Sequence, residues 1–392
     1  MELIDSMKLE RGPRQGGERG RRRRDVAALL AISLLTFAGT RAGAQETAAQ
    51  AAPQDEAPAP ADETHSGPRI TFHGYLSQAY ARSDDNEIAG ISEDGTSDYR
   101  TAALQIRADV SEKDTFAIQF SHERFGDSDL QAFQDDVALD WLFYEHRFEA
   151  TTVKVGRVQI PFGIYNEVRD VGTLQPFYRP SINFYGEGAY TSETVDGIVL
   201  SRSFGQGRAW QLDGDVHFGN WEFINRSGGF SELKARDSIG VELWLSTPVD
   251  GLRIGAGGMR YDVDEPDGNR WNTYHVSLQG DFGRVATNVE YKEIDFGEGT
   301  YEAGYAHLGV RVTDAIVVNA QVEYSDLNID FFREGDFDDD LALGVNYAFR
   351  PDLVLKLEHH WNEGYTPEEP AQNFFAPKVE TNYFIASLST SF

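Results

Sequence analysis

The sequence predicts an all-β protein: a transmembrane antiparallel β-barrel of about 16 strands, with one long loop folded into its lumen. Three observations support this fold class. Apolar and polar residues alternate with a period of two along most of the chain after residue 69. Short turns alternate with long, acidic, Gly-rich loops between these segments. The chain ends at Phe392, on a strand with one apolar and one polar face, as outer-membrane barrels do.

The first 44 residues have the composition of a cleaved signal peptide. Residues 21–24 are all Arg, residues 26–39 are mostly apolar, and a small-residue cleavage site ends at Ala44. The apolar run is short for a membrane-spanning helix. We therefore predict that this segment is removed during export. Residues 45–68, rich in Ala, Pro and Glu, should form a disordered periplasmic leader, and residues 69–392 the barrel.

The chain of 392 residues has a net charge of −29 and contains no Cys. The negative charge argues against nucleic acid as a partner, because phosphate requires a basic surface. The absence of Cys excludes disulfides, thiolate metal sites and a Cys nucleophile. No segment after residue 44 is apolar enough for a membrane helix. In a barrel only every second residue faces lipid, so low average hydropathy is expected.

The strand-like segments have the length of tilted membrane strands. In one of them Leu104, Ile106 and Ala108 alternate with Gln105 and Arg107. The faces of two segments, residues 137–147 and 194–203, are ambiguous. Aromatic residues also gather near strand ends, as interfacial girdles require. These are Tyr99, Tyr261, Tyr274, Tyr291, Tyr301, Tyr324, Trp361 and Phe392.

The connections fall into two classes. Short turns lie near residues 111–114, 148–150, 205–208, 248–251, 283–284, 313–314 and 350–352. Long loops lie near residues 82–98, 125–135, 161–192, 220–237, 263–271, 296–300, 327–338 and 363–379. Short periplasmic turns and long external loops are typical of membrane barrels. A soluble β-sandwich or propeller would not sort its connections so regularly.

Many ionisable residues fall on the polar faces of the strands. Their number is too large for a dry interior, because desolvation of charge is costly. A barrel of about 16 strands is also wide enough to hold water. The alternative is that the charges pair with one another and nothing passes. The predicted lumen-lining charges are Arg107, Asp109, Asp213, Asp215, Glu242, Asp281, Glu290, Lys292, Glu323, Lys356 and Glu358.

The third long loop, residues 161–192, is rich in Pro and aromatic residues. Such a loop should pack against a surface, and the barrel wall is the nearest one. Folded inward, it would narrow the lumen and set a transverse field across it. The alternative is a lid or a subunit contact outside the pore. The predicted constriction residues are Arg157, Pro161, Phe162, Gly163, Glu167, Arg169, Asp170 and Arg179.

Residues 156–163 read Gly-Arg-Val-Gln-Ile-Pro-Phe-Gly and lead into this loop. This motif resembles the phosphate-selective O/P-type porin superfamily, and the strand layout is similar over residues 70–392. The resemblance implies a 16-stranded trimeric outer-membrane channel with its third loop in the lumen. Anion-selective members line the pore with a ladder of Arg and a Lys cluster. The polar faces here are net acidic, so we do not expect anion selectivity.

Other signals are weaker. Residues 262–269 do not have the spacing of a calcium loop, because position 5 is Pro266. The acidic residues 336–340 are expected to form a solvated loop that binds divalent cations loosely. His359 and His360 should point to opposite faces of a strand and are poor zinc partners. His275 lies near Ser277, but this spacing is common by chance, so we predict no enzyme activity and no cofactor.

The sequence therefore predicts a Gram-negative outer-membrane porin for passive diffusion of small hydrophilic solutes or ions. The expected partners are lipid, lipopolysaccharide, a homotrimer, and the barrel-assembly machinery, which would recognise the strand ending at Phe392. Two alternatives remain. One is a structural or adhesive barrel with a closed lumen, and the other is a barrel enzyme. Conductance would separate the porin from the closed barrel, and hydrolysis lost on changing one Ser or His would indicate the enzyme.

Overall fold

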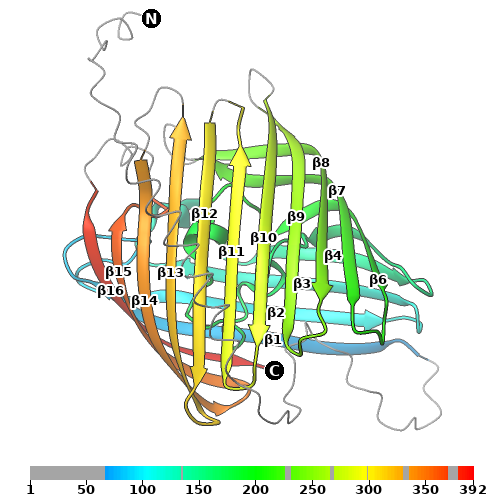
Figure 1. Cartoon of the computed structure of the whole chain (residues 1–392), viewed down its shortest axis with the longest axis horizontal. Coiled ribbons are helices and arrows are strands. Elements are labelled where there is room, and N and C mark those ends of the chain that lie inside the picture. Colours follow the sequence, from blue (N-terminus) through cyan, green and yellow to red (C-terminus); the bar gives the residue numbers. More distant parts are fainter. Residues whose placement is uncertain are drawn as a thin grey trace, which may run out of the picture. The chain divides into compact units, whose positions relative to one another are not determined.

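The computed structural model describes residues 67–133, 136–225, 231–264, 269–297, 299–329, 335–369 and 378–392. Within them, 16 strands form one closed antiparallel barrel, shown in Figure 1. Each strand pairs with its neighbours in the sequence, and β1 pairs with β16 to close the ring. The predicted fold class is therefore confirmed. The predicted signal peptide and nearly all of the predicted leader lie outside the described residues.

The strand bounds are β1 Arg69–Ser83, β2 Thr96–Asp109, β3 Asp114–Phe125, β4 Ala138–Arg147, β5 Thr152–Gln159, β6 Thr194–Phe204, β7 Gln211–Asn225, β8 Ser231–Ser246, β9 Leu252–Val263, β10 Arg270–Asp281, β11 Val285–Asp295, β12 Gly299–Arg311, β13 Ile316–Ile329, β14 Gly335–Arg350, β15 Leu353–Gly364 and β16 Glu380–Ser391. The described residues also form three short helices, η2 Asp129–Phe133, η3 Asn166–Val168 and α2 Ile182–Tyr185. Among the described residues, no helix has the length and apolarity needed to cross a membrane.

The outer face of the barrel is apolar because alternate strand residues point outward. On β8, Val241 and Leu243 are 40% and 42% exposed, while Glu242 between them is 2% exposed. The last strand behaves as predicted, with Phe384, Leu388 and Phe392 outside. Backbone hydrogen bonds join Phe392 to Gly74 of β1 in both directions, at 3.1 and 3.0 Å. The terminal aromatic residue thus lies at the seam that closes the barrel.

Two details differ from the sequence predictions, and one ambiguity is resolved. Paired strands occupy parts of the predicted loops 220–237 and 327–338, because β7, β8, β13 and β14 extend into them. The ambiguity of residues 137–147 comes from a bulge between β3 and β4, where Leu139 and Leu142 both point outward. Three predicted girdle residues point inward instead. Tyr99, Tyr261 and Tyr301 are each 1% exposed.

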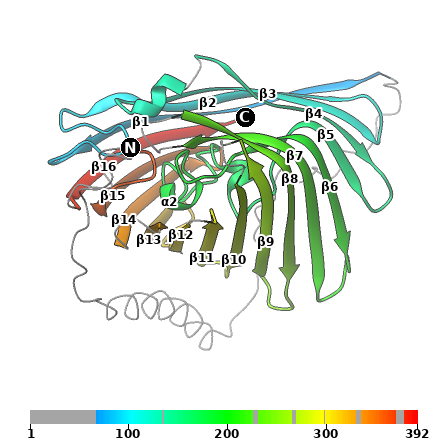
Figure 2. The same ribbon diagram turned by 90° about the horizontal axis from the view of Figure 1, so that it is seen from above.

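The connection between β5 and β6, residues 160–193, is called L3 below. Figure 2 shows that its helix α2 lies inside the ring of strands. L3 contains η3 and α2 and carries most of the aromatic residues noted in the sequence. The prediction that this loop folds into the lumen, which forms part of the predicted fold, is therefore confirmed.

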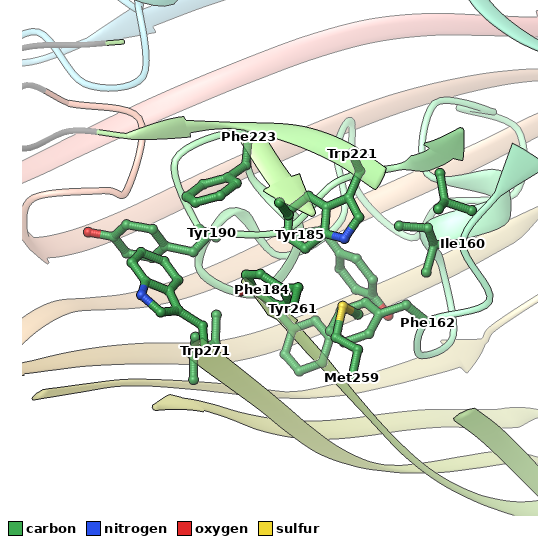
Figure 3. Packing of buried hydrophobic residues seen from close by; sticks show 14 of the residues in the cluster. Ile160, Phe162, Phe184, Tyr185, Tyr190, Trp221, Phe223, Met259, Tyr261 and Trp271 are labelled. Carbon is green, nitrogen blue, oxygen red and sulfur yellow. The ribbon is translucent and has the colours of Figure 1, made fainter. Parts of the chain in front are cut away.

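Aromatic packing holds L3 against the inner wall, as Figure 3 shows. The ring of Phe162 lies 5.4 Å from that of Phe184 and 4.4 Å from that of His275 on β10. Tyr190 packs between Trp271 and Tyr301, at 6.0 and 5.5 Å between ring centroids. Burying each such aromatic side chain contributes about 2 kcal/mol. L3 is therefore a packed element of the barrel interior.

Candidate functional site

The entry of L3 into the barrel depends on a turn at Gly163. Its φ of +63° lies in the left-handed region that favours glycine. A Cβ at this position would lie 2.5 Å from the Tyr185 hydroxyl and 2.6 Å from Oε1 of Glu290. The Pro-Phe-Gly motif therefore turns the chain toward β11, while Phe162 is buried beside His275. Pro161 is buried as well.

The Tyr185 hydroxyl accepts the backbone N–H groups of Ile164 at 2.8 Å and Tyr165 at 3.1 Å in this turn, and Glu290 of β11 lies behind it. The Glu290 carboxylate accepts hydrogen bonds from the backbone N–H of Ile164 at 3.0 Å and from the Tyr185 hydroxyl. It also accepts from the wall hydroxyls of Ser277 at 2.5 Å and Tyr305 at 2.6 Å. Glu290 is 2% exposed. Four donors thus replace the water that this carboxylate would otherwise need.

Two buried lysines hold the carbonyl groups of L3. Lys292 of β11 donates to the carbonyl oxygens of Phe184 at 2.6 Å and Ala189 at 2.8 Å. Lys356 of β15 donates to the carbonyl oxygen of Phe177 at 2.5 Å. The two side chains are 0% and 1% exposed. Each ammonium group is therefore stabilised by the backbone of L3 in place of water.

Two further wall carboxylates bind the middle of L3. Glu358 of β15 accepts the backbone N–H of Tyr178 with both oxygens, at 3.0 and 3.1 Å. Glu323 of β13 accepts the Ser181 hydroxyl and, at 3.3 Å, the backbone N–H of Asn183. L3 is thus fixed to strands on one side of the barrel by charges of both signs.

These contacts correct one prediction. Glu290, Lys292, Glu323, Lys356 and Glu358 point inward, as predicted, but they do not line water. They are at most 8% exposed and lie beneath L3. The argument that many inward charges require a wet interior fails for these five, because the polar backbone of L3 supplies their partners.

L3 leaves a cleft on the side of β1, β2 and β3. The cleft contains about 470 Å³ of empty space, including part that is open to solvent. Charged groups of both signs face it. Its wall residues are Ser77, Thr101, Glu123 and Phe125, and its main L3 residues are Arg169, Asp170, Tyr178, Arg179, Tyr185 and Glu187.

Arg169 is the centre of the charge network in the cleft. Its guanidinium group pairs with Glu187, lies 3.5 Å from Glu193 and 4.0 Å from Asp170, and donates to the carbonyl oxygen of Tyr185 at 3.2 Å. Burial raises the pKa of Asp170 to about 6, although Arg169 opposes this shift. Burial also raises the pKa of Glu193, and the neighbouring Asp140 and Asp170 add to the shift.

Three of these carboxylates lie close enough to share a cation. Oxygens of Asp140, Asp170 and Glu193 all lie within 4.8 Å of one another. Arg169 already supplies positive charge to two of them, at 3.5 and 4.0 Å. We therefore assign the compensation of this group to Arg169 and assign no metal to it.

Two predicted site residues lie away from L3 and the cleft. Arg157 was expected at the constriction, but it faces outward on β5, level with the exposed Leu142 of β4. It pairs there with Asp196 at 2.8 Å. The reason is strand alternation, because Val155 on the same face is 44% exposed. Asp281 is exposed at the end of β10, and it accepts the backbone N–H of Gly283 in the following turn.

The remaining predicted charges are spread over the inner wall and L3. Arg107 and Asp109 pair with each other at 2.9 Å near the short-turn end of β2. Asp213 and Asp215 are partly exposed on β7, and Glu167 is exposed on L3. Glu242 is buried, with its carboxylate 2.6 Å from Nε2 of His275. The structure does not bring these residues into the cleft.

The acidic segment near residues 336–340 is not a solvated loop in its described part. Asp338 and Asp340 belong to β14 and are 1% and 6% exposed. Asp338 accepts a hydrogen bond from Asn183 of L3 at 2.6 Å, and Asp340 lies 2.8 Å from Nδ1 of His360. His359 points to the opposite face and packs against the outward Trp361, as the sequence predicts.

Sequence reasoning did not assign several cleft residues to this site. Ser77, Thr101 and Phe125 carry no distinctive signal on their strands. Glu187 lies within the predicted loop, but nothing in the sequence marks it as the partner of Arg169. Glu368 pairs with Arg179 at 2.7 Å and comes from the loop after β15. A contact between residues so far apart in the chain has no local signature.

Solved outer-membrane proteins have a similar fold. OmpT of Vibrio cholerae superposes with a TM-score of 0.55 at 13% identity, covering 84% of this chain and 99% of OmpT. The DcaP channel of Acinetobacter baumannii superposes with a TM-score of 0.54 at 10% identity, covering 84% of this chain and 99% of DcaP. An anion-selective porin from Comamonas acidovorans superposes with a TM-score of 0.54 at 12% identity, covering 83% of this chain and 100% of that porin. One structure of Vibrio OmpT is of a trimer form.

No protein-family model matches the chain, and no curated protein sequence does. The solved structures named above are 10–13% identical to this chain, so they establish a shared fold. The chain has the closed 16-stranded fold of outer-membrane porins.

Proposed function

We propose that this protein is a porin of a Gram-negative outer membrane, and that small hydrophilic solutes and ions diffuse passively through it. The observation that carries the proposal is the cleft between L3 and the strands β1 to β3. Polar and charged groups line it, and a water-filled passage needs such a lining. The apolar outer face supports a membrane location.

The cleft also supports a preference for cations or zwitterions over anions. Glu123, Asp170 and Glu187 line it together with Arg169 and Arg179. Both arginines are already paired with carboxylates, Arg169 with Glu187 and Arg179 with Glu368. The remaining carboxylates give the cleft a negative field, which raises the local concentration of cations. Arg157 lies on the outer face and adds no positive charge to the cleft.

Several finer features belong to the same proposal. The resemblance of residues 156–163 to O/P-type porins supports the channel architecture. We propose that residues 1–44 are removed on export and that residues 45–68 form the periplasmic leader. The strand ending at Phe392 is proposed to bind the assembly machinery, and lipid and lipopolysaccharide to contact the outer face. A homotrimer is proposed because Vibrio OmpT has a trimer form.

Planar-bilayer conductance tests the proposal. The refolded protein, without residues 1–44, is expected to give ohmic steps and a cation-favouring reversal potential across a salt gradient. A folded barrel that gives no steps would contradict the channel. Steps with an anion-favouring potential would keep the channel and contradict the assigned selectivity.

A structural barrel with a closed lumen is the second candidate. It is favoured by the extent of the L3 contacts, which reach β11, β13, β14, β15 and β16. Examples are the bond from Asn346 to the carbonyl oxygen of Pro176 at 2.9 Å and that from Thr173 to Ser391 at 3.2 Å. The cleft along β1 to β3 favours the porin. The conductance experiment distinguishes the two.

A further inference from the structure

The loop after β15, residues 365–379, places a buried carboxylate against Arg179, one of the residues that line the cleft. Its described part begins with Tyr365, whose backbone N–H donates to the carbonyl oxygen of Phe337 at 3.1 Å. A turn follows, in which Thr366 and Glu369 exchange hydrogen bonds at 3.0 and 3.1 Å. This turn presents Glu368 toward L3. The Glu368 side chain is 0% exposed, although it lies in a loop.

Glu368 binds L3 at two places. Its two carboxylate oxygens accept hydrogen bonds from the guanidinium group of Arg179, at 2.7 and 2.5 Å. One oxygen also accepts the backbone N–H of Glu187 at 3.3 Å. A bidentate arginine–carboxylate pair fixes both the position and the charge of its partners. Glu368 therefore links the final loop to the part of L3 that lines the cleft.

Arg179 is the cleft arginine whose positive charge is compensated by this contact. Its guanidinium group lies 4.7 Å from the centre of the Phe125 ring, and its side chain is 18% exposed. Arg169, the other cleft arginine, has the L3 carboxylates of Glu187 and Glu193 around it. Arg179 has no ion pair with an L3 carboxylate among the described residues. Without Glu368 it would present an uncompensated positive charge to the passage.

We infer that Glu368 is a selectivity-determining residue, because it neutralises Arg179 and so leaves the cleft net negative. This inference rests on the proposed channel function and deepens it. The final loop thereby sets the sign of the field at a constriction that L3 builds. A change confined to Glu368 is expected to alter ion preference while the strand ladders stay intact.

The test is the reversal potential of Glu368→Gln in a salt gradient. The cation-to-anion permeability ratio is expected to fall about fivefold, which corresponds to about 1 kcal/mol. The effect should shrink as salt rises, because charge is screened over about 3 Å at 1 M. Glu363→Gln is the matched control, because Glu363 is exposed on β15 and makes the same charge change away from the cleft.

The double variant Glu368→Gln/Arg179→Gln distinguishes an effect of charge on selectivity from an effect of misfolding. It removes both members of the pair, so the ratio is expected to return toward the wild-type value. If the wild type conducts and Glu368→Gln has the same reversal potential, the role of Glu368 is overturned while the channel function is kept. The role is also overturned if the double variant keeps the shifted ratio. A folded wild type without conductance would overturn the channel function itself, together with this role.

Discussion

Replacing Glu290 with Ala is expected to release L3 from the wall while the barrel stays folded. The change removes an acceptor for the hydroxyls of Tyr185, Ser277 and Tyr305. It also removes one of the two acceptors of the Ile164 backbone N–H, which keeps the Tyr185 hydroxyl at 2.8 Å. Leaving buried donors without a partner costs about 1–3 kcal/mol each, so the docking of L3 should weaken by about 3–5 kcal/mol. The strand ladders do not depend on this side chain.

The expected readouts are a larger single-channel conductance and faster proteolysis within L3. The heat-dependent gel shift of a folded barrel should be retained. Glu290→Gln should lie between the wild type and Glu290→Ala, because an amide oxygen still accepts hydrogen bonds. Glu293→Ala is the control, since Glu293 lies on the outer face of the same strand. Unchanged conductance and unchanged proteolysis in Glu290→Ala would refute the anchoring role.

The second large effect is a loss of cation preference in acid. With a pKa of about 6, Asp170 is ionised at pH 8 and protonated at pH 4.5. Acidification therefore removes a negative charge from the cleft. The permeability ratio should fall about fivefold on acidification, which corresponds to about 1 kcal/mol for one charge near the permeating ion. The charged and titratable groups around Asp170 are Tyr75, Glu123, Asp140, Arg169, Arg179, Glu187 and Glu193.

Asp170→Asn isolates this contribution. The variant should have, already at pH 8, a ratio close to that of the wild type in acid, and it should lose most of the pH dependence. Any dependence that remains is assigned to the neighbouring carboxylates of Glu123, Asp140 and Glu193. Asp281→Asn is the control, because Asp281 is exposed in a turn at the end of β10. A full pH dependence in Asp170→Asn would contradict the assignment.

Strand alternation explains how much of the fold could be predicted. Wherever a strand is regular, as in residues 239–245 of β8, the period of two predicts both the strand and its outward face. It was ambiguous at residues 139–142, because a bulge places Leu139 and Leu142 on one face. The same rule could have placed Arg157 outside, from its spacing to Val155. Arg157 was instead expected at the constriction, because the Pro-Phe-Gly motif follows it in the sequence.

The site was less predictable because its contacts join distant parts of the chain. The aromatic composition of L3 was sufficient to predict that it packs inward. Nothing local to Glu290 or Lys292 shows that their partners are backbone groups of L3 rather than water. The pairing of Arg179 with Glu368 likewise depends on the path of two loops. Such contacts follow from the closed topology, which brings these residues together.

The central claim is that ions pass through the cleft between L3 and the strands β1 to β3. The chain contains no Cys, so Glu123→Cys creates a single thiol on the cleft wall. A cationic thiol reagent applied in a planar bilayer should modify this residue and reduce the single-channel current. Leu104→Cys, on the outer face of β2, should leave the current unchanged. Labelling of Glu123→Cys, confirmed by mass, with an unaltered current would contradict the claim.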